Sequence, residues 1–111
     1  MTLLSVRQSF LASALLLWGS AVFAGDVQKG KQRAAMACAV CHGVVGIAPM
    51  PSAPNLAGQQ ALYLSEQLRA YRSGARRHEV MGVIAKPLTD EDIENLSAWY
   101  ASIRVQVEPA S

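Results

Sequence analysis

The residues most suited to chemistry are concentrated in one stretch of this sequence, Cys38-Ala39-Val40-Cys41-His42, which contains both cysteines of the 111-residue chain. On a helical turn, two thiols three positions apart project to the same side, at about the separation of the two vinyl groups of haem. Cys-x-x-Cys-His is the pattern for covalent attachment of a c-type haem. The spacing therefore predicts one haem (heme c), attached by thioether bonds to Cys38 and Cys41 and ligated at its iron by His42.

Other uses of a Cys-x-x-Cys pair fit this sequence less well. Thioredoxin-like redox chemistry requires a βαβ scaffold, and no strand pattern is found. A structural zinc site needs four N or S ligands, which Cys38, Cys41, His42 and His78 could supply, but the adjacent Cys41 and His42 cannot easily face one metal ion. A disulfide within a single turn would be strained and would close almost no loop. We therefore favour haem attachment.

The iron also needs a second axial ligand, for which the candidates are Met36, Met50, His78 and Met81. Met36 lies on the segment that carries the motif, so it cannot easily reach the opposite haem face. Met50 lies in a proline-rich stretch near the attachment side. His78 and Met81 precede the last predicted helix, where the chain could pass over the distal face. A thioether ligand raises the reduction potential and a second imidazole lowers it, but the residue types alone do not choose between the two.

The first 24 residues have the composition of a secretory signal peptide. Arg7 is their only charged side chain, a mostly apolar run spans Phe10–Trp18, and Val22 and Ala24 are the small residues expected at a cleavage site. The alternative is an uncleaved membrane anchor, but a spanning helix needs about 20 apolar residues, more than this run provides. We expect cleavage after Ala24, and hence export to the periplasm if the source is a Gram-negative bacterium.

Removal of the signal peptide, residues 1–24, leaves residues 25–111, which we expect to form one domain without stable membrane insertion. This mature chain carries nine Lys and Arg residues and eight Asp and Glu residues. Because a nucleic-acid-binding protein would show a clearly basic face, the charge balance argues against that function. A domain this small buries a limited fraction of its surface, and a covalently held haem would help to stabilise it.

Helical periodicity is found in three segments of the mature chain, and no segment has the alternation of a convincing strand. The segments span about residues 26–41, 60–73 and 90–103, separated by loops over residues 43–59 and 75–88. Asp26 is a plausible N-cap of the first helix, and Gly74 suits the end of the second. Thr89 and Asp92 have the spacing of a capping box at the start of the third. The sequence therefore predicts an all-α domain, with a frayed tail at residues 108–111.

The mature chain resembles a class I c-type cytochrome over nearly all of residues 25–103. The resemblance is to small soluble bacterial proteins with one haem and to the single halves of tandem di-haem proteins. The matching segments are Gly25-Asp26-x-x-Lys29-Gly30, Cys38-x-x-Cys41-His42-Gly43, Pro54-Asn55-Leu56-Ala57-Gly58-Gln59, Arg76 through Met81, Leu88-Thr89-Asp90-Glu91-Asp92-Ile93 and Trp99-Tyr100-Ala101-Ser102. This resemblance implies the small cytochrome c fold, with three main helices and long loops wrapped around a covalently bound haem.

The resemblance also implies roles for individual residues. Met81 matches the family's distal iron ligand. Pro54 matches the proline whose backbone carbonyl accepts a hydrogen bond from the other ring nitrogen of His42, which would fix the tautomer and orientation of that ligand. Gly30 and Tyr100 match the place where the first and last helices cross.

The functional hypothesis that follows is a monomeric single-electron carrier without enzymatic activity. With His42 and Met81 as axial ligands, no position on the iron is open to oxygen or peroxide. We expect redox partner proteins, but no nucleic acid, to bind the exposed haem edge through a small transient interface. The alternatives are an electron-transfer subunit of a larger dehydrogenase or oxidase complex, and a peroxidase or sensor with a labile distal ligand.

A group of arginines near the expected haem edge has two interpretations. The group could form a basic rim that attracts an acidic partner, or it could be an ordinary solvated helix face. Its members are Arg69, Arg72, Arg76 and Arg77.

Overall fold

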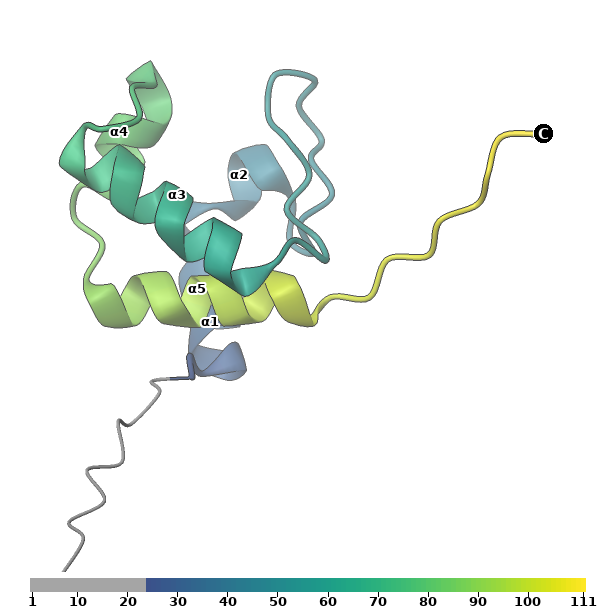
Figure 1. Ribbon diagram of the computed structural model, residues 1–111, viewed down its shortest axis with the longest axis horizontal. Helices are drawn as coiled ribbons and strands as arrows, with labels where there is room; N and C mark the ends of the chain where they lie inside the picture. Colours follow the sequence, from purple (N-terminus) through teal and green to yellow (C-terminus); the bar gives the residue numbers. More distant parts are fainter. Residues whose placement is uncertain (1–23) are drawn as a thin grey trace, which may run out of the picture.

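The structure is a computed structural model that describes residues 24–111. This part of the chain contains five helices joined by loops (Figure 1). In chain order they are α1 (Val27–Ala37), α2 (Ala39–His42), α3 (Ala61–Ser73), α4 (Glu79–Ala85) and α5 (Asp90–Ser102). No residue between 24 and 111 lies in a strand, so the prediction of an all-α fold is confirmed. The expected signal peptide lies outside the described residues, apart from Ala24.

Close contact between α1 and α5 depends on Gly30, which has no side chain. A Cβ atom at Gly30 would stand 1.9 Å from the backbone oxygen of Asn95 and 2.9 Å from the Cβ atom of Trp99. The crossing predicted at Gly30 is therefore present, but the nearest atoms belong to Asn95 and Trp99 rather than to Tyr100. The Tyr100 ring instead approaches Gly46, where an added Cβ atom would stand 2.9 Å from it.

Polar contacts also join the start of α1 to α5. The backbone N–H of Asp26 donates to Oδ1 of the buried Asn95 at 2.6 Å. The Asp26 side chain accepts from the backbone N–H groups of Gln28 and Lys29, both at 2.9 Å, so its predicted role as N-cap is confirmed. Ion pairs on the surface between the two helices are Lys29–Glu91 and Arg33–Asp92. The Lys29–Glu91 pair is exposed and contributes little to stability, whereas the Arg33–Asp92 pair is half-buried.

The hydrophobic core lies where α1, α3 and α5 meet, and the segment between α4 and α5 closes it. Its buried members are Ala34, Leu64, Ala85, Leu88, Ile93, Leu96 and Tyr100. The predicted end of α3 and the predicted start of α5 are confirmed. Thr89 and Asp92 form both hydrogen bonds of the capping box at the start of α5, and Gly74 ends α3 with φ 83°, in the left-handed region.

The predicted boundaries are wrong in two places. The helix predicted over residues 26–41 is interrupted at Cys38, whose φ of −120° and ψ of −30° end α1 before α2 begins. The loop predicted over residues 75–88 contains α4, a helix of seven residues. A helix this short shows too little periodicity to be recognised, and its N-cap is His78, which is not among the residue types that usually cap helices.

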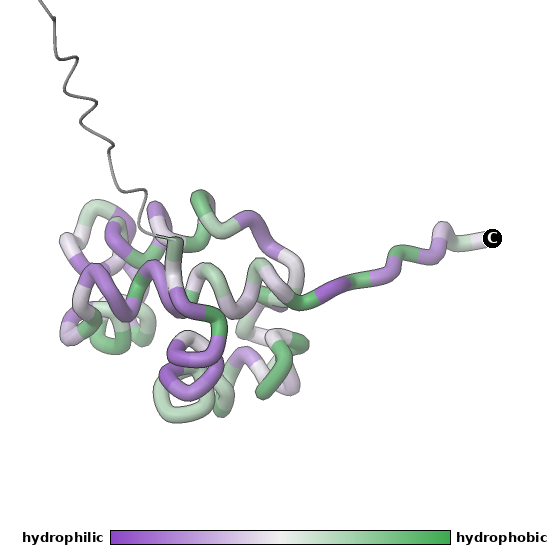
Figure 2. The backbone as a smooth tube through the Cα atoms, turned by 90° about the horizontal axis from the view of Figure 1, so that it is seen from below, coloured by the Kyte–Doolittle hydropathy of each residue, from purple (hydrophilic) through white to green (hydrophobic). Residues whose placement is uncertain are grey.

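Polar and apolar residues are interleaved along the helices, as Figure 2 shows. Within residues 24–111, no helix is long and apolar enough to span a membrane. After α5, residues 104–111 have no regular secondary structure and extend away from the helices (Figure 1). The irregular tail is therefore longer than the predicted one at residues 108–111.

Candidate haem site

Cys38, Cys41 and His42 lie on a single helical turn, as the motif predicts. The backbone N–H groups of Cys41 and His42 both donate to the backbone oxygen of Cys38, at 3.3 and 2.9 Å. Cys38 and Cys41 are both free thiols, and both are half-buried. This turn therefore presents two unblocked thiols and one imidazole within five residues.

The His42 ring is buried and held in one orientation. The residue is 7% exposed, and Nδ1 lies 2.8 Å from the backbone oxygen of Pro54. A carbonyl oxygen can only accept a hydrogen bond, so in this pair Nδ1 carries the proton and donates. The neutral ring then has an unprotonated Nε2, which is the form that binds a metal ion. The hydrogen bond that the resemblance implied is in the structure, and it fits His42 for coordination through Nε2.

Hydrogen bonds across the loop between α2 and α3 fix the position of Pro54. The N–H of Leu56 donates to the backbone oxygen of Gly46 at 2.8 Å, and the N–H of Ala48 donates to Oδ1 of Asn55 at 2.7 Å. Gly46 has φ 77°, and a Cβ atom there would stand 2.6 Å from the backbone of the opposite arm of the loop. Glycine is therefore required at this position for the two arms of the loop to approach each other.

Tyr100 of α5 lies beside Cys38, and the two side chains affect each other's protonation. Burial raises the pKa of the Tyr100 phenol well above its ordinary value, and the neighbouring Cys38 adds to the effect. Burial also raises the pKa of the Cys38 thiol, against smaller opposing effects of Tyr100 and Arg33. Both groups are therefore neutral near pH 7, because burial at the edge of the apolar core disfavours their charged forms.

Exposed apolar side chains are concentrated on the segments that carry the predicted site residues. These segments are α2, the loop that follows it, and α4. Their large exposed apolar side chains are Val40, Val44, Val45, Ile47, Met50, Val80 and Val83. An apolar macrocycle seated against such side chains would remove them from water, which is favourable. The surface chemistry of these segments therefore fits a haem.

The candidate distal ligands occupy different environments. Met81 lies in the first turn of α4 and is half-buried, whereas Met36 of α1 is 74% exposed and Met50 of the loop is 41% exposed. His78 is the N-cap of α4, and its Nδ1 accepts hydrogen bonds from the backbone N–H groups of Val80 and Met81, both at 3.2 Å. This capping role is not predicted by the sequence, in which His78 is a candidate ligand of the haem iron or of zinc.

The zinc alternative lacks a ligand cluster in the described part of the chain. Among residues 24–111, no three His, Cys, Asp or Glu side chains are grouped so that they could hold a metal ion. The donors suggested for zinc, Cys38, Cys41, His42 and His78, are therefore not brought together as a zinc site.

The four arginines near the site are not equivalent. Arg69 forms an ion pair with Glu94, and Arg72 pairs with Asp90 at 2.6 Å, so two of the four are engaged with α5. The exposed Arg76 has its guanidinium 4.7 Å from the centre of the Tyr71 ring, and Arg77 is also exposed. The proposed basic rim is thereby reduced to Arg76 and Arg77.

Comparison with known proteins agrees with this geometry. The family model described as cytochrome c matches residues 27–104, a span that includes the Cys-x-x-Cys-His motif, Pro54 and Met81. The chain belongs to the cytochrome c family. The resemblance seen in the sequence, to a class I c-type cytochrome, is thereby confirmed.

Individual relatives show which members of the family the chain is similar to. Cytochrome c-554(548) of Halomonas halodenitrificans is 40% identical over 82 residues, which are 71% of this chain and 98% of the relative. Cytochrome c4 of Pseudomonas aeruginosa is 38% identical over 100 residues, which are 87% of this chain and 49% of the relative. The crystal structure of reduced recombinant cytochrome c4 from Pseudomonas stutzeri matches 79% of this chain and 50% of that chain, with a TM-score of 0.70 and 35% identity.

The chain thus spans nearly all of the first relative and about half of the cytochrome c4 proteins, and it is similar to one half of a di-haem cytochrome c4. Family membership, together with the Cys38–His42 motif, identifies the chain as an electron carrier with c-type haem.

Proposed function

We propose that residues 25–111 carry one haem c, attached through Cys38 and Cys41, and transfer single electrons in the periplasm without catalysing a reaction. The observation that carries this proposal is the 2.8 Å hydrogen bond between His42 Nδ1 and the Pro54 carbonyl, next to two free thiols. When bound, the haem supplies an iron that alternates between Fe(II) and Fe(III). The chain supplies an imidazole whose orientation and tautomer are set in advance, so little structural change accompanies electron transfer.

Met81 is the distal ligand in this proposal, and the hydrogen bonds of His78 support that choice. Because His78 Nδ1 accepts two backbone N–H groups, it carries no proton in this arrangement. A neutral imidazole must then hold its proton on Nε2, which leaves no lone pair there for iron. To ligate iron through Nε2, His78 would have to give up the cap of α4. Met81 can ligate iron while the cap stays in place.

Ligation of the iron from both haem faces would explain why the protein transfers electrons but does not act on substrates. The His42 imidazole and the Met81 thioether would both ligate the iron, which would leave no place on it for water, oxygen or peroxide. A thioether also favours the reduced state and raises the reduction potential. The exposed Arg76 and Arg77 would then face acidic surfaces of redox partner proteins.

Export as a monomer is the remaining part of the proposal. The composition of residues 1–24 supports export, and the charge balance of residues 25–111 gives no indication of a nucleic-acid partner. Sedimentation of the haem-loaded protein across a range of concentrations tests the oligomeric state. A single species with the mass of one chain is expected, and a concentration-dependent dimer would contradict this part.

The distal ligand is tested by redox-resolved absorption spectra of the exported wild type, of Met81→Ala and of His78→Ala. Methionine ligation gives a weak ferric sulfur-to-iron band at the red end of the spectrum, and we expect Met81→Ala to lose it. Met36→Ala is the matched control, because that side chain is 74% exposed on α1. A wild type without this band, or a Met81→Ala variant that retains it, would rule out Met81 as the ligand.

A further inference from the structure

His78 holds the backbone of the first turn of α4, the turn that contains Met81. Its Nδ1 accepts from the N–H groups of Val80 and Met81, and its backbone oxygen accepts from the N–H of Gly82 at 2.8 Å. The N–H groups of three consecutive residues, with Met81 in the middle, are therefore bonded to one residue. The direction in which the Met81 side chain leaves the helix depends on these bonds, because they set the backbone of the turn.

Little of this turn is buried, because Glu79 and Val80 are exposed and Met81 and Gly82 are only half-buried. The helix has seven residues, far fewer than the roughly 12 to 15 at which an isolated helix is even marginally stable. Only Ala85, in its last turn, is fully buried, while Val80 and Val83 are 51% and 71% exposed. The first turn therefore depends on its N-terminal cap more than a long, well-packed helix would.

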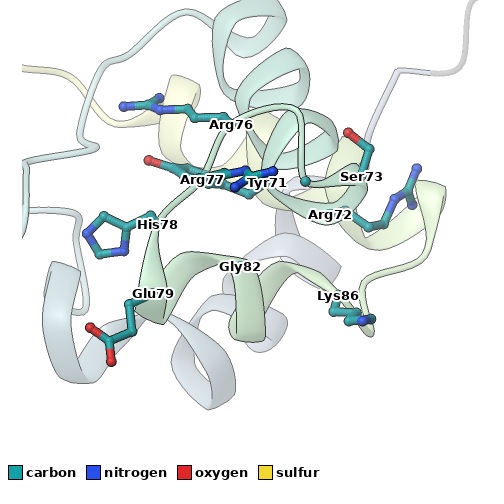
Figure 3. Close-up of a pocket in the computed structure, with 10 residues that line it drawn as sticks. Tyr71, Arg72, Ser73, Arg76, Arg77, His78, Glu79, Gly82 and Lys86 are labelled. Atoms are coloured by element: carbon teal, nitrogen blue, oxygen red, sulfur yellow. The ribbon is translucent and has the colours of Figure 1, made fainter.

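The His78 ring is itself fixed by the end of α3. It meets the Tyr71 ring edge to face, with 6.2 Å between centroids and an interplanar angle of 77°. Arg76 lies over the same Tyr71 ring, 4.7 Å from its centroid, and donates to Gln67 at 2.8 Å. Figure 3 shows Arg76 and Tyr71 above the helix that begins at Glu79, and His78 at the start of that helix. Tyr71 of α3 thus adds a contact to the residue that caps α4.

We propose that His78 is a positioning residue for Met81, holding the thioether at the iron by capping α4 rather than by binding the iron itself. This inference rests on the proposed His42/Met81 ligation. Loss of the cap would leave the Met81 side chain chemically intact but would let the first turn of α4 fray. The fraction of molecules whose iron lacks Met81 would then rise.

The expected size follows from the usual effect of an N-cap. Removing one cap side chain changes a local folding equilibrium by roughly fivefold. Carbon monoxide binds ferrous haem only where Met81 has left the iron, so the apparent carbon monoxide affinity scales with the open fraction. His78→Ala should therefore raise that affinity roughly fivefold over wild type and weaken the sulfur-to-iron band.

Variants at two helix caps separate positioning from a general loss of stability. His78→Asn keeps a side-chain acceptor at the cap but removes the aromatic ring, so it should restore the wild-type band and carbon monoxide affinity. Thr89→Ala removes a cap of α5, where Thr89 Oγ1 accepts from Asp92 N at 3.0 Å. It should lower the unfolding temperature and leave both spectroscopic measurements at the wild-type level.

The experiment measures the ferric sulfur-to-iron band and carbon monoxide titration of the ferrous, haem-loaded protein for wild type, His78→Ala, His78→Asn and Thr89→Ala. An effect of His78→Ala that His78→Asn reverses supports the inference. If the wild type shows the band and His78→Ala matches it in both measurements, or if Thr89→Ala has the same effect as His78→Ala, the positioning role is overturned while Met81 ligation stands. If the wild type lacks the band, the proposed ligation fails, and this inference fails with it.

Discussion

Two glycine-to-alanine substitutions, one in α1 and one in α4, should change stability in opposite directions. Intrinsically, alanine is favoured over glycine inside a helix by about 1 kcal/mol. At Gly82 of α4 nothing lies within 4 Å of an added Cβ atom, so Gly82→Ala should stabilise the protein by about 0.5–1 kcal/mol. At Gly30 of α1 the same methyl group would stand 1.9 Å from the backbone oxygen of Asn95.

The clash at Gly30 cannot be relieved by a side-chain rotation, because the obstructing oxygen belongs to the backbone of α5. The two helices must separate by about 1 Å or more to restore ordinary contact. Separation loosens the α1–α5 packing and weakens the hydrogen bond from Asp26 N–H to Asn95 Oδ1. Overpacking of this kind costs more than the helix-propensity gain, and we expect a net loss of about 3 kcal/mol.

Thermal unfolding of the haem-loaded variants, followed by far-ultraviolet circular dichroism, measures both effects. For a domain of this size, a loss of about 3 kcal/mol lowers the Tm by more than about 10 °C. Gly82→Ala should raise the Tm by a few degrees. A Gly30→Ala variant with the wild-type Tm, or a Gly82→Ala variant destabilised as strongly as Gly30→Ala, would show that the helix crossing has been misassigned.

Further predictions concern acid stability and partner binding. Burial favours the neutral form of Asp92, but its hydrogen bonds with Thr89 and its ion pair with Arg33 together outweigh this effect and leave the Asp92 pKa below its ordinary value. Its contribution to stability is therefore present above the unfolded-state pKa of about 4 and is lost as the pH falls through the lower folded-state pKa. Asp92→Asn should flatten this part of the acid-unfolding curve, and an unchanged curve would contradict the assignment. Neutralising both Arg76 and Arg77 to Gln should slow electron transfer to an acidic partner at low ionic strength, whereas Arg69→Gln should have a smaller effect because Arg69 is already paired. Equal effects of the two changes would argue against a basic rim at Arg76 and Arg77.

Local signals allowed much of the fold to be predicted from the sequence. Thr89 and Asp92 are three positions apart and form a capping box, and Gly74 ends α3 in the left-handed conformation that glycine favours. The Cys38–His42 turn is likewise a local feature, because its hydrogen bonds close within five residues. Such features depend on residues that are near one another in the chain, so a sequence pattern is enough to identify them.

Features that depend on distant residues were predicted less well. The partners of Gly30 on α5 are Asn95 and Trp99, and the helix register that selects them is set by packing in three dimensions. The sequence suggests that Arg69 could bind partners, because it does not show that Arg69 forms an ion pair with Glu94. The helix α4 was missed because it depends on His78, whose ring is held in turn by Tyr71 of α3. In each case the decisive contact joins segments that no local pattern relates.

Covalent attachment of one haem to Cys38 and Cys41 can be measured as the intact mass of the exported protein under denaturing conditions. We expect a single species with the mass of residues 25–111 plus one haem. The Cys38→Ala, Cys41→Ala double variant should lose that added mass. A wild-type mass without haem, or haem released when the chain is denatured, would contradict the claim.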